Sequence, residues 1–284
     1  MAKKYAYLFL IMIVVLILVN CEKNTVNGND KGFNDKKFDE WKLIWDDEFE
    51  EEEIDSTKWV YDIGGHGWGN KELQYYTNRP INSFIENGKL IIQAVKESYI
   101  KDGKEWQYTS ARIKTMNKGD WKYGRVEVKA KLPYGQGIWP AIWMLPTEWK
   151  YGGWAASGEI DIMEMLGHET NKVYGTIHYG GQWPDNVHTG KSFVLKDGDF
   201  SKEFHTFAIE WDTTYIKWFV DDSCYQMQTE WWSSGGPYPA PFDQKFHLIM
   251  NIAVGGNWPG YPDETTEFPQ RMEIEYVRVY QKIR

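Results

Sequence analysis

The sequence predicts an all-β protein, built as a sandwich or barrel of antiparallel strands. Short runs in which apolar and polar residues alternate recur along most of the chain, separated by Gly, Asn, Asp and Pro turns. No long run with the 3.6-residue period of an amphipathic helix interrupts them. With 284 residues and 42% apolar content, the chain is long enough for one large core.

The N-terminal segment has the organisation of an export signal. Two lysines precede an apolar run, residues 5–19, which is short for a transmembrane helix of about 20 residues and fits a signal peptide. Residues 18–21, Leu-Val-Asn-Cys, resemble a bacterial lipobox, so we expect a lipid on Cys21. Because Asn20 stands where such signals usually have Gly, Ala or Ser, ordinary cleavage and an uncleaved anchor are the alternatives.

These features predict a signal peptide at residues 1–20, a flexible polar tether at 21–37 and one folded domain at 38–284. We expect an exported bacterial lipoprotein, held on the cell surface or in the periplasm through Cys21, or a secreted protein if no lipid is attached. The only other cysteine, Cys224, lies in the folded part. The fold must therefore depend on its core rather than on disulfides.

The clearest strand patterns are spread over the whole domain. They lie at residues 41–49, 89–94, 125–132, 215–220 and 272–280. The Asn87-Gly88 pair before the second segment is typical of a hairpin turn, and Asp221-Asp222 after the fourth also indicates a turn. The last segment ends close to residue 284, so we expect no second module after it.

The net charge and the aromatic content of the chain indicate which class of molecule it binds. The formal net charge of −9 argues against nucleic acid, whose phosphates require clustered Lys and Arg, and is compatible with a neutral polymer. The chain has 16 Trp and 18 Tyr, more than a core of this size needs. Flat aromatic rings stack on the apolar faces of sugars, although core packing accounts for part of them.

The run at residues 158–165, Gly-Glu-Ile-Asp-Ile-Met-Glu-Met, is the most informative feature of the sequence. Alternation places Glu159 and Asp161 on one face of a strand. Glu164 breaks this register by one position, and a β-bulge would return it to the same face. Three like charges on one strand face cost stability, so we expect the charge to be used.

Paired carboxyl groups of this kind suit sugar chemistry. Cleaving a glycosidic bond needs an acid to protonate the leaving oxygen and a carboxylate to attack or stabilise the anomeric carbon. A third carboxylate between them can push their pKa values apart. The alternatives for the motif alone are a solvated strand face or a calcium site.

Beyond this motif, several phrases resemble the bacterial laminarinases of glycoside hydrolase family 16. The active-site strand of that family, in its bulged form, is similar to residues 159–164. The other matching phrases lie, in the same order as in the family, at residues 67–76, 109–114, 121–125, 132–143, 173–178 and 251–260. The resemblance extends from about Trp41 to Tyr280, nearly the whole folded domain.

The resemblance implies a jelly-roll β-sandwich of two curved antiparallel sheets, similar to concanavalin A, with a concave substrate cleft. It implies retaining hydrolysis of internal β-1,3-glucosidic bonds, with Glu159 as nucleophile, Glu164 as general acid/base and Asp161 as the assisting carboxylate. Retention requires the two reacting carboxyl groups to be about 5–5.5 Å apart, which we expect a concave bend of the strand to achieve.

Six further residues match cleft positions of the family and are expected to bind substrate. They are Asn70, Arg112, Trp121, Trp139, Trp143 and His178. The two tryptophans of residues 132–143 are four positions apart in a strand and so share a face, with a core position as the alternative for Trp143. Turn and sheet structure is the alternative for Asn70 and Arg112. The remaining histidines show no zinc-binding spacing, and we interpret them as incidental.

A structural calcium ion is a separate expectation, carried over from many members of the family. The matching positions are Glu48, the backbone carbonyl of Gly88, and Glu275, where Asp is commoner. Oxygen ligands suit calcium, and the ion would stabilise the fold without taking part in the reaction. No cofactor is expected for catalysis.

The sequence therefore predicts a monomeric endo-β-1,3-glucanase whose partner is a β-glucan polysaccharide. Three alternatives stay open: activity on mixed-linkage β-1,3-1,4-glucan or another polysaccharide, transglycosylation through the same covalent intermediate, and glucan binding without hydrolysis. All three acids are present, which argues against the last of these.

Overall fold

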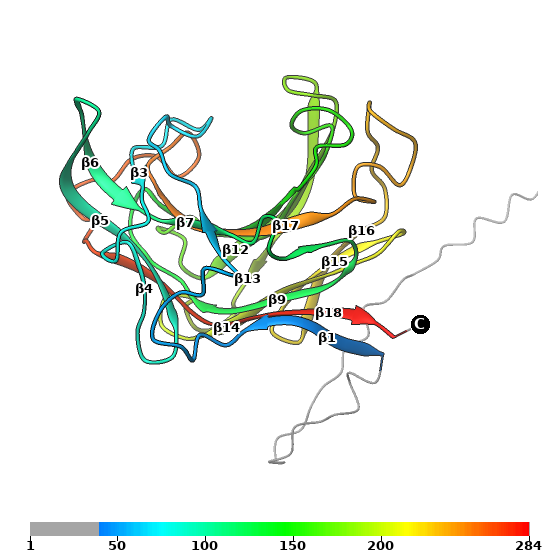
Figure 1. The fold of residues 1–284 in the computed structure, drawn as a ribbon, viewed down its shortest axis with the longest axis horizontal. Coiled ribbons are helices and arrows are strands. Elements are labelled where there is room, and N and C mark those ends of the chain that lie inside the picture. The colour runs from blue at the N-terminus through cyan, green and yellow to red at the C-terminus, as the bar shows by residue number, and fades with distance from the viewer. Residues whose placement is uncertain (1–39, 284) are drawn as a thin grey trace, which may run out of the picture. The chain divides into compact units, whose positions relative to one another are not determined.

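A computed structural model describes residues 40–283, and these form two β-sheets with no α-helix. They lie within one compact unit, Gly32–Arg284. Figure 1 shows the two sheets as stacked layers, with loops rising on both sides of the layer that contains β12 and β17. The all-β prediction is thus confirmed. Cys21 and the predicted segments 1–20 and 21–37 lie outside the described residues.

The ten-stranded sheet is antiparallel except at one edge, where β3 pairs with β6 in parallel. In spatial order its strands are β16 (Ser223–Gln228), β15 (Ile216–Val220), β14 (His205–Trp211), β9 (Gly124–Lys131), β18 (Gln270–Lys282), β5 (Leu90–Lys101), β6 (Lys104–Ser110) and β3 (Tyr75–Tyr76), with β1 (Trp41–Asp47) paired to β18 and β4 (Ser83–Ile85) paired to β5.

The eight-stranded sheet is antiparallel throughout the described residues. In spatial order its strands are β13 (Asn186–Val194), β12 (Lys172–Gly180), β11 (Glu159–Glu164), β10 (Ile138–Pro146), β17 (Phe246–Val254), β7 (Arg112–Lys114) and β2 (Val60–Tyr61), with β8 (Asp120–Trp121) paired to β17.

Each strand predicted from its alternation pattern is present. The five segments correspond to β1, β5, β9, β15 and β18. The hairpin before β5 closes through Asn87 and Gly88, whose φ angles of 54° and 67° are those that a tight turn of this kind requires. Turn chemistry and period-two patterning therefore determined these elements locally.

The core lies between the two sheets and contains the inward side chains of both. Along β10, Ile138, Ile142 and Met144 are buried in the core, whereas Trp139 and Trp143 point to the opposite face. This alternation is the period of two expected of a strand covered on one side. The described residues include no helix long and apolar enough to cross a bilayer.

One core side chain of the ten-stranded sheet supports the strand that holds the three acids. Trp218 of β15 is fully buried, and its indole N–H donates to the backbone carbonyl of Asp161 at 2.8 Å. The indole lies beside Gly175 of β12, where an added Cβ would come within 2.4 Å of the ring. The glycine thus leaves room for the ring that links the two sheets.

We expect Trp218→Phe to destabilise the fold, because the buried Asp161 carbonyl loses a donor and the core loses volume. The expected loss in free energy of unfolding is about 2–4 kcal/mol. Chemical denaturation of the two proteins measures it, with the exposed Trp183→Phe as a matched control that should change stability by less than about 0.5 kcal/mol. Equal stability of wild type and Trp218→Phe would contradict this role.

Candidate active site

The bulge predicted in the acidic strand is present in β11. On the side of β10 the register changes from Ile142↔Met163 to Trp143↔Asp161, and on the side of β12 it shifts between Asp161 and Glu164. The extra residue lets both Ile162 and Met163 enter the core, where they are 2% and 0% exposed. It also brings Glu164 to the face that already holds Glu159 and Asp161.

That face is the floor of a cleft of about 1120 Å³ on the eight-stranded sheet. The cleft is lined by all three acids and by five of the six predicted binding residues, Asn70, Arg112, Trp139, Trp143 and His178. The fold therefore brings together eight of the nine predicted catalytic and substrate-binding residues. Trp143 is a cleft residue rather than a core residue.

Trp121 is the exception. It is 6% exposed, packs edge-on against Trp45 with ring centroids 5.2 Å apart, and does not line the cleft. Its strand β8 is only two residues long, so no local alternation could show which way the ring would face. The expectation that Trp121 binds substrate is replaced by a core role.

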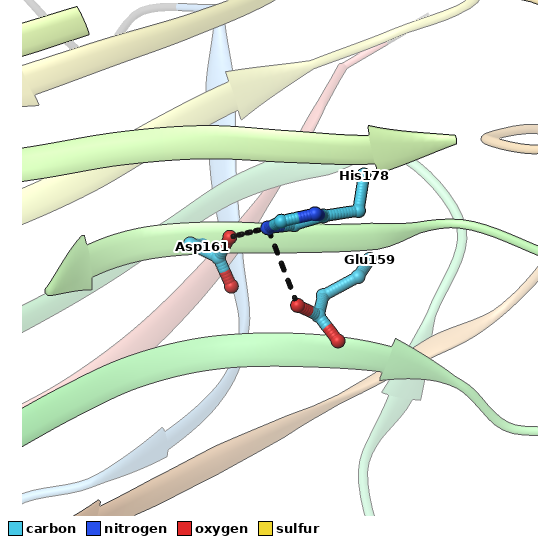
Figure 2. A group of neighbouring side chains, drawn as sticks. All are labelled: Glu159, Asp161 and His178. Carbon is cyan, nitrogen blue, oxygen red and sulfur yellow. Dashed lines mark ion pairs between the residues drawn. The ribbon is translucent and has the colours of Figure 1, made fainter. Parts of the chain in front are cut away.

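His178 of β12 lies beside the acids because it pairs directly with Glu159 in the sheet. Its Nε2 is 3.3 Å from Asp161 Oδ2 and 3.7 Å from Glu159 Oε1, and Figure 2 shows the imidazole directed at both carboxyl groups. Ligand atoms of these three residues lie within 4.8 Å of one another, so the group could hold a metal ion.

Two indole N–H groups hold the outer carboxyl groups in place. Trp154 donates to Glu159 Oε2 at 2.8 Å, and Trp139 donates to Glu164 Oε1 at 3.1 Å. A rigid ring that donates one hydrogen bond fixes a carboxyl group while leaving its second oxygen for other contacts. The two glutamates are therefore oriented independently, each by its own tryptophan.

The acids have shifted pKa values. Burial, followed by the charge of Asp161, raises the pKa of Glu159 to about 7, against the opposing effects of His178, Trp154 and Arg112. Burial and the charges of Asp161 and Glu159 raise the pKa of Glu164 well above its ordinary value. Burial disfavours the charged form of His178, but its hydrogen bond to Asp161 and the neighbouring acids outweigh this and raise its pKa to about 9.

The cleft also contains an arginine held between two aromatic rings. The Arg112 guanidinium lies 4.7 Å from the Trp68 ring centroid and 4.6 Å from that of Trp143. Its Nε is 2.9 Å from Asp62 Oδ2. Cation–π contact and the ion pair together fix its planar head.

Several cleft residues were not predicted from the sequence. They are His66, Trp68, Glu72, Trp154, Tyr174, Trp183, His188 and Trp258. Trp68, Glu72, Tyr174 and Trp258 stand inside phrases that resemble the family, so a signal for them was available. Trp154 and Trp183 come from loops that carry no such signal. His66 and His188 were interpreted as incidental, and their position in the cleft corrects that interpretation.

The two carboxylates expected to bind calcium form ion pairs with basic side chains instead. Arg278 donates to both carboxylate oxygens of Glu48, at 2.7 and 2.9 Å, and Lys129 Nζ is 2.7 Å from Glu275 Oε2. Gly88 forms part of the turn before β5. A calcium ion would have to displace both cations from their carboxylates, so these residues as arranged do not fit calcium.

Comparison with known proteins agrees with the fold. The model of glycosyl hydrolases family 16 matches residues 69–278. A β-glucanase of Rhodothermus marinus is 44% identical over 93% of this chain and 91% of its own length. A glucan endo-1,3-β-glucosidase A1 of Niallia circulans is also 44% identical, over 84% of this chain, which spans 38% of that protein's length.

Solved structures of laminarinases have the same fold. The laminarinase catalytic domain of Thermotoga maritima superimposes with a TM-score of 0.77 and 46% identity, covering 86% of this chain and all of that domain. The two-sheet arrangement is therefore the jelly-roll sandwich that the sequence predicted.

The raised pKa of Glu159 should make the fold less stable as pH rises. Between its unfolded value near 4.5 and its folded value of about 7, the folded protein binds more protons than the unfolded chain, so the free energy of unfolding falls. Glu159→Gln cannot ionise and should be more stable than wild type above pH 7, by about 1–3 kcal/mol, with little gain at pH 4. Denaturant titrations across pH 4–8 measure the difference. A gain in stability that does not vary with pH would show that the ionisation of Glu159 is not its cause.

Proposed function

Because the chain belongs to family 16 of the glycosyl hydrolases, we propose that it hydrolyses internal β-1,3-glucosidic bonds of laminarin-type β-glucans with retention of configuration. The observation that carries the proposal is the pair Glu159 and Glu164, which face one cleft and whose pKa values are both raised by burial and by the charge of Asp161. The β-1,3 linkage is supported by relatives named for it.

The surroundings of the two glutamates suit two different roles. Glu159 corresponds to the nucleophile position of the family strand, and the neighbouring His178 imidazole and the Trp154 N–H favour its ionised form. Burial and the charges of Asp161 and Glu159 raise the pKa of Glu164 well above its ordinary value, which suits a general acid. Asp161 contributes to both shifts, because its charge raises both pKa values.

In the first step, the Glu164 carboxylic acid protonates the glycosidic oxygen while the Glu159 carboxylate attacks the anomeric carbon. The bond between the anomeric carbon and the glycosidic oxygen breaks, and an ester forms between the sugar and Glu159. The sugar on the other side of the bond leaves as an alcohol. Esterification removes the charge of Glu159, so the pKa of Glu164 falls and its carboxylate persists as a base.

In the second step, the Glu164 carboxylate takes a proton from water, and the resulting hydroxide attacks the anomeric carbon. The ester to Glu159 breaks, and both glutamates return to their starting states. Two inversions at one carbon give net retention. A sugar hydroxyl in place of water would give transglycosylation by the same route.

His178 and Asp161 form an ion pair beside the nucleophile Glu159. The imidazolium attracts the anionic form of Glu159, which limits how far burial can raise the pKa of the nucleophile. Asp161 is 2% exposed, and its Oδ2 faces the imidazole Nε2 at 3.3 Å. We assign both as positioning residues that balance the charge around the nucleophile.

The walls of the cleft suit a chain of pyranose rings. Trp139 and Trp143 project from β10 onto the substrate face, and Trp258 packs edge-on against Trp139 at 5.5 Å. Asn70 and Arg112 supply polar groups beside these rings. Aromatic faces for the apolar sides of the sugars and a few fixed polar groups for the hydroxyls make a binding site for a neutral polymer.

The proposed reaction needs no cofactor, because the nucleophile, the acid and the base are all side chains of the chain itself. We also propose that the protein acts as a monomer, exported and attached to the membrane through a lipid on Cys21. This attachment rests on the sequence of residues 18–21.

The wild-type protein should release reducing ends from laminarin and curdlan, and none from agarose. Glu159→Gln should lower turnover on laminarin by at least about 10³-fold, because the amide cannot form the ester intermediate, while glucan binding is retained. A reducing-sugar assay and calorimetric titration with a β-1,3-glucose hexamer measure the two properties. The control is Glu203→Gln, at an exposed position outside the cleft.

Several outcomes would count against the proposal. Normal turnover by Glu159→Gln would overturn the role of that residue, and an inverted anomer in the first product, seen by NMR, would overturn retention. Faster cleavage of lichenan than of laminarin would favour mixed-linkage specificity. Glucan binding by the wild type without any reducing ends would favour a binding protein.

The lipid anchor has its own test. Mass spectrometry of the membrane fraction should find an N-terminal peptide beginning at Cys21 and increased in mass by acyl chains. Cys21→Ser should release the protein into the soluble fraction with its glucanase activity unchanged. A mature wild-type protein that begins at another residue would refute lipidation.

A further inference from the structure

Glu72 lines the cleft but belongs to neither the acid pair nor its supporting residues. Its carboxylate accepts three hydrogen bonds. Gln74 Nε2 donates at 2.6 Å and the Tyr76 hydroxyl at 3.3 Å, both to Oε2, and Asn70 Nδ2 donates at 3.3 Å to Oε1. Gln74 and Tyr76 are buried, so their polar groups depend on these bonds.

The direction of each bond toward Glu72 is fixed by chemistry. The backbone N–H of Val254 can only donate, and it donates to Gln74 Oε1 at 2.7 Å. The amide of Gln74 must then present its NH₂ group to Glu72. Reversing the Gln74 amide, or changing its rotamer, would break its hydrogen bond with Val254 of β17.

A second chain of bonds ends at the same carboxylate. The indole N–H of Trp143 can only donate, and it donates to Asn251 Oδ1 at 2.8 Å. Asn251 must then donate through Nδ2 to the Tyr76 hydroxyl oxygen, at 3.1 Å, and the Tyr76 hydroxyl in turn donates to Glu72. The cleft tryptophan and the Glu72 carboxylate are thus the two ends of one polar chain.

The Gln74 amide and the Tyr76 hydroxyl can therefore act only as donors toward Glu72. A side chain at position 72 can accept the hydrogen bonds of all three donors only if it carries no donor of its own, as a carboxylate does. The third donor, Asn70, takes its orientation from Glu72: because its NH₂ group donates to the carboxylate, its Oδ1 is left as an acceptor. Asn70 lines the cleft, and its backbone carbonyl accepts from the Asn257 N–H at 2.8 Å.

We propose that Glu72 is a positioning residue that fixes Asn70 with its side-chain oxygen available to a sugar hydroxyl, so that this part of the cleft accepts a hydrogen-bond donor from the glucan. This inference rests on the proposed function for its ligand. It goes beyond it in assigning Glu72 a role in substrate affinity that is separate from the chemistry at Glu159 and Glu164.

The substitution Glu72→Gln tests the polarity of the site with almost no change in shape. The side-chain oxygen of the variant can serve Gln74 and Tyr76, which leaves the new NH₂ group facing Asn70. The Asn70 amide must then reverse and present NH₂ instead of oxygen to the sugar. We expect about tenfold weaker binding of a β-1,3-glucose hexamer, measured by calorimetry in the inactive Glu159→Gln background.

The double variant Asn70→Asp with Glu72→Gln restores the acceptor. One carboxylate oxygen at position 70 receives the new NH₂ group at position 72, and the other is again available to the sugar. Hexamer affinity should return to within about threefold of the parent. In proteins with intact Glu159, Glu72→Gln should raise KM for laminarin about tenfold with kcat changed less than about twofold.

The control is Glu97→Gln, which replaces another partly buried, hydrogen-bonded glutamate that does not line the cleft and should leave hexamer affinity unchanged. Affinity unaffected by Glu72→Gln, or loss that the double variant does not repair, would overturn the role of Glu72. Absence of hexamer binding by the parent would instead overturn the proposed function, so the two failures are distinguishable.

Discussion

The concentration of negative charge on β11 is the constraint on which the rest of the site depends. Three carboxyl groups share one face of a six-residue strand, and burial raises the pKa of the two outer ones. The molecule offsets this cost locally. The bulge sends two adjacent apolar residues into the core, the imidazole of His178 supplies positive charge, and indole N–H groups bind the outer carboxyl groups.

Tryptophan has two different roles in this fold. Trp59, Trp211 and Trp218 are buried in the core, where each also donates its single N–H group to a buried acceptor. Trp139, Trp143 and Trp154 stand on the cleft face and use the same N–H group to orient polar side chains. The abundance of this residue in the composition thus reflects both packing and recognition, as the sequence suggested but could not apportion.

The sequence was informative wherever the determinant was local. Alternation with one register break in residues 159–164 predicted the acidic face and the bulge, because both depend on neighbours in the strand. The prediction that Trp121 lines the cleft was wrong, because a two-residue strand shows no alternation and the ring's partner, Trp45, is distant in the chain. Glu72 stands in a phrase that resembles the family, but the sequence could not show its role, because its partners Gln74 and Tyr76 are oriented by residues of β17 that are 180 and 175 positions away from them.

The pairing of the first strand with the last has a consequence for how such a domain can be combined with others. The Ile283 N–H donates to the Glu40 carbonyl at 2.8 Å, so both ends of the described chain meet at β1 and β18 (Figure 1). These strands belong to the ten-stranded sheet, whereas the cleft lies on the other sheet. A module joined directly at residue 40 or residue 283 would therefore be attached to the sheet that does not hold the cleft, which suits this sandwich to combination with other domains.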